Sequence, residues 1–112
     1  MQIIKQPASL IILWEARVTA FDEMMKIVVD INKNLIAVDA EMHADLEQLL
    51  LLEGSAQQDL WGANIFPLRS KEDQIEFTSL INIRPSLGNR SMEVTDPSIR
   101  EKIRIIVSDL LT

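Results

Sequence analysis

The residues best suited to chemistry lie in the five-residue stretch that begins at Glu41. His43 is the only histidine of the chain, and an imidazole changes charge near neutral pH, so it suits a general base oriented by Glu41 or Asp45. The same ring could hold a divalent metal with Asp59 or Glu76. The alternative is structural, with His43 and Asp45 opening a helix and Glu41 solvated. This spacing matches no established zinc motif, so we predict no metal site.

A second group of polar residues follows a strongly alternating segment. Asn82 and Arg84 lie at its end, and Asn89 and Arg90 follow Gly88 in the irregular stretch behind it. Two guanidinium groups beside exposed backbone amides suit a phosphate or carboxylate, which predicts an anion or nucleotide site. The alternative is that these side chains tie the loop to the sheet, because a loop of about ten residues needs such ties or a function.

The third candidate combines an indole with neighbouring polar side chains. Trp61 stands beside Gly62 in a short apolar segment, where it could form a stacking wall for a ring-shaped ligand. A tryptophan in such a segment more commonly belongs to the core, with its N–H paired. Asn64 and Glu76 are expected to face each other across a hairpin, where they line either a pocket or the solvent face.

Hydrophobic spacing and capping residues divide the chain into helices and strands. The expected helices cover residues 10 to about 20, residues 43–52, and a segment that begins at Asp96 and Pro97. The expected strands cover residues 24–31, 35–41, 60–66 and 74–84, with residues 1–6 as a short strand or an arm. Residues 74–84 give the strongest strand signal, because apolar and polar residues alternate there.

These elements predict two hairpins, residues 24–41 and residues 60–84. In the first hairpin, either of two turn positions places Lys26 opposite a carboxylate, Asp39 or Glu41, so charge pairing supports the hairpin without fixing its register. Short connections between neighbouring strands favour antiparallel pairing. We therefore expect one α+β domain over residues 1–112, with an antiparallel sheet of about four strands and three helices packed mainly on one face.

Composition and charge limit the cellular compartment and the kinds of partner that we expect. The chain has no cysteine, which removes disulfides and thiolate sites and favours a reducing compartment. Its first residues lack the basic-then-apolar order of a signal peptide, and no apolar stretch approaches the roughly 20 residues of a membrane span. A net charge of −6 opposes contact with nucleic acid phosphates. We therefore expect a soluble cytoplasmic protein that binds neither nucleic acid nor membrane.

Several strings also occur in a fixed order along the chain. They are residues 41–45, Gly54-Ser55, residues 59–64, residues 75–77, residues 81–85 and residues 88–91. Together they resemble a family of small bacterial hypothetical proteins classified as a domain of unknown function. The resemblance covers nearly the whole chain and implies a stand-alone cytosolic domain, but it implies no activity, cofactor or substrate.

Our leading functional prediction is a non-catalytic binding or interaction module that forms a homodimer. It rests on the first helix, which is apolar on more than one face, and on the leucine run at residues 49–52. One alternative is a small hydrolase or metal-assisted enzyme that uses His43 with a nearby carboxylate, Glu41, Asp45 or Asp59. Another is anion or nucleotide binding at Arg84 and Arg90.

Overall fold

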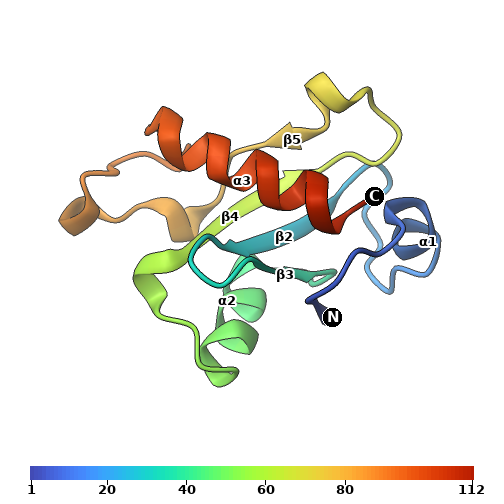
Figure 1. Cartoon of the computed structure of the whole chain (residues 1–112), viewed down its shortest axis with the longest axis horizontal. Coiled ribbons are helices and arrows are strands. Elements are labelled where there is room, and N and C mark those ends of the chain that lie inside the picture. The colour runs from blue at the N-terminus through green and yellow to red at the C-terminus, as the bar shows by residue number, and fades with distance from the viewer.

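The computed structural model describes all residues, 1–112, and its centre is a five-stranded antiparallel sheet in the order β1-β3-β2-β4-β5 (Figure 1). The strands are β1 (Gln2–Ile4), β2 (Met25–Asp30), β3 (Leu35–Val38), β4 (Leu60–Ile65) and β5 (Ile75–Glu76). Both predicted hairpins, β2/β3 and β4/β5, are present. The fifth strand is β1, which comes from the N-terminal segment and pairs with β3.

Three α-helices cover the two faces of this sheet. They are α1 (Leu10–Glu15), α2 (His43–Leu52) and α3 (Pro97–Leu110). The larger core joins α1 and α3 to one face, and α3 crosses that face in Figure 1. On the opposite face, Leu46 and Leu50 of α2 pack on Val28 and Ala37. The predicted α+β class is therefore confirmed, with two of the three helices sharing a face. No helix is long and apolar enough to cross a membrane.

The first helix is shorter than the sequence predicts. It ends at Glu15 rather than near residue 20, because backbone N–H groups after the helix bond to the side chain of Asp39. Asp39 accepts hydrogen bonds from the Val18 N–H at 2.9 Å and from the Thr19 N–H at 3.3 Å. These bonds fix the chain after α1 in a non-helical path, and Val18 is left 80% exposed.

The register of the first hairpin places Asp39 beyond Val38, opposite Lys26. The carboxylate does not face the Lys26 ammonium, however, because Asp39 adopts a left-handed backbone with φ of 71°. Its side chain instead accepts a 2.7 Å hydrogen bond from the Thr19 hydroxyl. One of the two predicted registers is thus present, without the charge pair that suggested it.

The prediction of one long strand over residues 74–84 is wrong beyond its first residues. Within this range only β5, Ile75–Glu76, pairs with β4. The chain then leaves the sheet and forms a 3₁₀ turn, η3 (Leu80–Asn82). Phe77 enters the core on the α3 side, whereas Ile81 packs on the α2 side. The alternating apolar residues are therefore buried in two different cores instead of all facing one side of a single strand.

Candidate functional site

A cavity of about 310 Å³ with both polar and apolar lining residues lies between the start of α2 and η3, and we call it the α2 cavity. Two residues of its wall, Lys26 on β2 and Asn64 on β4, are directly opposed partners in the sheet. His43 and Ala44 contribute the first turn of α2. The remaining lining residues are Met42, Thr78, Ser79, Leu80, Ile81 and Met92. The cavity thus combines polar groups from the sheet with apolar groups from the segments above it.

His43 is buried, and its Nε2 atom lies 2.8 Å from the carbonyl oxygen of Ala63. The ring therefore donates its N–H to this carbonyl and keeps its lone pair on Nδ1. Burial lowers the pKa of His43, the hydrogen bond with Ala63 opposes that shift only in part, and the Lys26 charge lowers the pKa further. The imidazole is consequently neutral near pH 7.

The first turn of α2 has free backbone donors beside the cavity. The residue at the N-cap is Met42, whose side chain has no oxygen to accept a hydrogen bond. The Asp45 N–H bonds to the Met42 carbonyl, but the N–H groups of His43 and Ala44 have no acceptor in the protein. Two donors therefore remain at the positive end of the helix dipole.

Asn64 is the polar residue at the centre of the cavity wall. Its Nδ2 atom donates a 2.9 Å hydrogen bond to Oε1 of Glu76, its cross-strand partner on β5. The predicted pairing of these two residues across the second hairpin is thus confirmed. The other branch, Oδ1, is buried and has no hydrogen-bond partner, a state that costs about 1–3 kcal/mol unless a ligand or water supplies a donor.

Lys26 is the only cationic side chain that lines the α2 cavity. Its ammonium forms no ion pair with any carboxylate of the chain, although it lies 5.5 Å from the Phe21 ring centroid. A partly buried lysine without an anionic partner is available to a ligand anion.

The structure does not bring together the four residues predicted to act as catalytic groups. Glu41 and Asp45 are exposed and form no hydrogen bond with His43. Asp59 lies in the 3₁₀ turn η1 (Gln57–Asp59), at the opposite end of β4 from Ala63. No group of three or more histidines and carboxylates is arranged to hold a metal ion. His43 therefore has no carboxylate to orient it.

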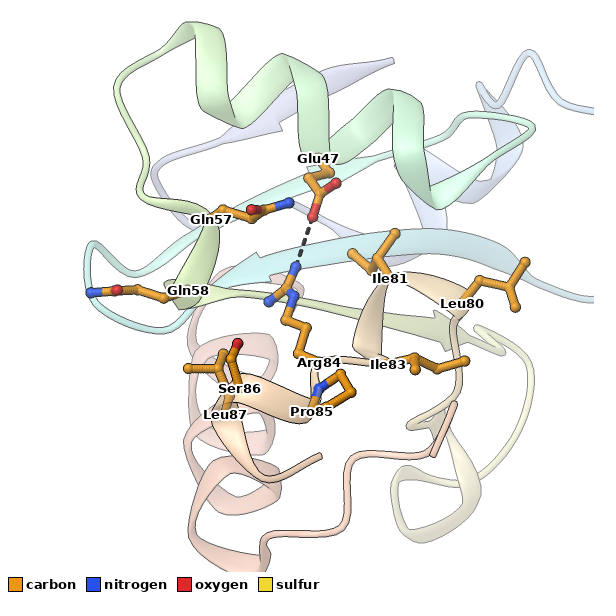
Figure 2. A pocket seen from close by; sticks show the side chains of 10 residues that line it. All are labelled: Glu47, Gln57, Gln58, Leu80, Ile81, Ile83, Arg84, Pro85, Ser86 and Leu87. Carbon is orange, nitrogen blue, oxygen red and sulfur yellow. Dashed lines mark hydrogen bonds and ion pairs between the residues drawn. The ribbon is translucent and has the colours of Figure 1, made fainter. Parts of the chain in front are cut away.

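Arg84 lies in a second groove, of about 630 Å³, on the other side of η3. Figure 2 shows its side chain reaching up to α2, where it forms a 2.7 Å ion pair with Glu47. A second guanidinium nitrogen donates to the Leu60 carbonyl. Burial lowers the pKa of Arg84, and the Glu47 charge opposes that shift. These contacts tie the loop to α2 and β4, as the structural alternative predicts. The Arg84 guanidinium is already paired with Glu47 and is therefore not available to bind an anion.

The two asparagines of the same group also serve as internal ties. Asn82 binds both backbone groups of Gly62, accepting from its N–H and donating to its carbonyl, each at 2.9 Å. Asn89 holds the loop through its Nδ2 atom, which donates to Asn82, Ser91 and Glu93 carbonyls. Arg90 is exposed and takes no part in these networks. The structure therefore brings Arg84, Asn82 and Asn89 together without leaving a free anion site among them.

Trp61 belongs to the core. It is only 2% exposed and packs within the larger core on the α3 side, although its indole N–H has no partner. A ring buried in this way offers no face to a ligand.

The sequence analysis missed Lys26 and Met42 as members of a site. Lys26 was assigned to a cross-strand charge pair, which the turned side chain of Asp39 prevents. The signal at Met42 was readable, because Ser, Thr, Asp or Asn normally occupies the residue before a helix. An apolar residue at that position leaves the first-turn donors free.

Fold and site together define an α+β protein with a cavity at the start of a helix that has no side-chain cap. The chain belongs to the family described as Protein of unknown function (DUF5674), which matches residues 2–110. No match was found among curated proteins or among solved structures.

Proposed function

We propose that this protein is a non-catalytic binding module that holds a small molecule in the α2 cavity. The observation that carries this proposal is the buried Oδ1 of Asn64, which has no hydrogen-bond donor in the protein. Residues that line the same cavity carry three donors without an acceptor in the protein, namely the Lys26 ammonium and the N–H groups of His43 and Ala44. A site with convergent unpaired polar groups and an apolar rim is typical of ligand pockets.

The state of His43 favours binding over catalysis. Its N–H is committed to the Ala63 carbonyl, and no carboxylate contacts the ring. A general base requires an imidazole that can take a proton from substrate and then carry the charge. Burial and the nearby Lys26 charge both disfavour that charged form. His43 is better suited to fixing the position of α2 above β4.

A thermal-shift screen with a panel of metabolites tests this proposal. At least one compound should raise the melting temperature of the wild-type protein. Ala44→Phe should abolish that rise, because Ala44 is exposed at the cavity mouth and a phenyl ring there fills the space. Ala20→Phe, at an exposed position away from the cavity, is the matched control and should respond as wild type. A panel without any stabilising compound would refute the proposal.

We also propose that the module forms a homodimer in the bacterial cytoplasm. Three apolar side chains at and after α1 are exposed: Ile11 at 43%, Ile12 at 67% and Val18 at 80%. An apolar surface of this kind favours association with a like surface. The lack of cysteine is in keeping with a reducing compartment, and the bacterial origin rests on the sequence resemblance.

A further inference from the structure

We propose that the ligand of the α2 cavity is a free α-amino acid with an apolar side chain, bound as a zwitterion. This inference rests on the proposed binding function and specifies its ligand. It follows from the signs of the unsatisfied groups on the lining residues, which are donors on α2 and β2 and an acceptor on β4.

The unsatisfied donors suit a carboxylate. The free N–H groups of His43 and Ala44 stand at the start of a ten-residue helix, where a negative group is stabilised by the helix dipole. Lys26 lines the same cavity and has no carboxylate partner within the chain. A ligand carboxylate has two oxygens, so it can accept hydrogen bonds from the helix and still pair with the ammonium.

The unsatisfied acceptor suits an ammonium. Asn64 is 8% exposed, and its Oδ1 has no donor, because its Nδ2 is already bound to Glu76. The Glu76 carboxylate adds negative charge directly beside this oxygen. An ammonium would satisfy Oδ1 with a charge-assisted hydrogen bond and would be favoured by Glu76.

The distribution of charge argues against a ligand with net negative charge, such as a phosphate. Glu41 and Asp45 flank the first turn of α2, and Glu76 stands behind Asn64. These three carboxylates repel an anion, whereas a zwitterion has no net charge and presents one partner to the donors and another to the acceptor. The single cation, Lys26, matches a single carboxylate.

Apart from Thr78 and Ser79, the remaining lining residues are apolar, and they define the third part of the ligand. Met42, Leu80 and Met92 are 58%, 71% and 42% exposed around the opening. Methionine side chains adapt to apolar groups of different shape. An apolar amino-acid side chain would cover this rim, and the cavity volume of about 310 Å³ lies at the small end of ligand pockets.

Isothermal titration calorimetry with L-leucine, N-acetyl-L-leucine, L-leucinamide and inorganic phosphate tests the assignment. L-leucine should bind, and loss of either charged end should weaken binding at least about tenfold, the factor for one charge-assisted hydrogen bond. Phosphate should not bind. Equal affinity for L-leucine and either derivative, or binding of phosphate in preference to L-leucine, would overturn the proposal.

A pair of variants at Met42 tests the role of the helix start. Met42→Asn supplies a neutral N-cap side chain that can accept from the Ala44 N–H, whereas Met42→Ala removes the same side chain and leaves that group free. Relative to Met42→Ala, Met42→Asn should raise the melting temperature and weaken L-leucine binding at least about tenfold. Equal binding by the two variants would contradict the proposal.

Failure of this assignment is distinguishable from failure of the proposed function. If L-leucine and L-methionine do not stabilise the protein, but another compound stabilises wild type and not Ala44→Phe, the cavity binds a ligand of a different class. If no compound stabilises the protein, both proposals fail.

Discussion

Asn82 occupies the place of a missing strand at the edge of β4. β5 pairs only with Asn64 and Ile65, so the backbone of Gly62 lacks a neighbouring strand on that side. The completely buried amide of Asn82 supplies both a donor and an acceptor to Gly62, and its Nδ2 also donates to the Met92 carbonyl. One side chain thus satisfies three backbone groups that would otherwise be buried without partners.

Asn82→Ala should therefore lower the free energy of unfolding by about 3 kcal/mol or more, because each unpaired buried group costs about 1–3 kcal/mol. Asn82→Asp should be no better, since it replaces a donor with an oxygen that faces two carbonyls. Urea unfolding monitored by circular dichroism measures both changes. Ser86→Ala, on the exposed side of the same loop, is the control, with an expected change within about 0.5 kcal/mol.

His43 makes stability depend on pH. Burial lowers its pKa below the ordinary value of 6.5, so below that pH the unfolded chain binds more protons than the folded chain. The stabilising effect of the neutral ring is complete above about pH 6.5 and is lost as the pH falls below it. Two carboxyl groups with lowered pKa, Asp39 and Asp96, act in a separate window below 3.8.

Chemical denaturation of wild type and His43→Gln between about pH 5 and pH 8 measures this effect. Glutamine keeps an N–H donor for the Ala63 carbonyl but does not titrate. Wild-type stability should decline on the acidic side of the range, and His43→Gln should remove most of that decline. A wild-type curve that stays flat, or one that rises as the pH falls, would show that the ring is not held in its neutral form.

Among the elements, local patterns predicted the helix starts and the first hairpin well. The reason is that Asp96 with Pro97 and the β-branched residues of β2 act on their own neighbourhood. Alternation in residues 74–84 was misleading, because Phe77 and Ile81 are buried in different cores. The candidate site was predicted only in part. His43 and Asn64 were named, but their meeting with Lys26 depends on the pairing of β2 with β4, which local patterns do not determine.

The close approach of η3 to β4 depends on Gly62, because a glycine within a strand lets another segment come close to the backbone. A Cβ atom at Gly62 would lie 2.5 Å from Cβ of Ser79 and 3.1 Å from Cγ1 of Ile81. Gly62→Ala should therefore cost about 1–3 kcal/mol by overpacking. Ser79→Gly in the same chain should recover part of the loss, since it removes the nearer contact. Thermal unfolding of both single variants and the double variant measures the coupling.

At the scale of the whole molecule, the sheet is buried on both faces by a single chain. The solvent-accessible surface of 6199 Å² is close to the roughly 6200 Å² of an average monomeric protein of 12.7 kDa. The core therefore closes without a second copy. Self-association must therefore come from surface groups alone, and the exposed apolar residues at α1 are the surface groups best suited to hold two copies together.

Ile11, Ile12 and Val18 should accordingly support a dimer that dissociates on dilution, because only surface contacts hold the two folded copies together. Multi-angle light scattering across a dilution series measures the mass. The double substitution Ile12→Glu and Val18→Glu should shift the protein to a monomer, since it places like charges on both sides of the contact. Leu68→Glu, which alters a side chain that is 76% exposed elsewhere, should leave the dimer intact. Wild-type protein that remains monomeric at the highest concentration would exclude this dimer. Such a result would leave the binding proposal intact, because all residues that line the α2 cavity belong to one chain.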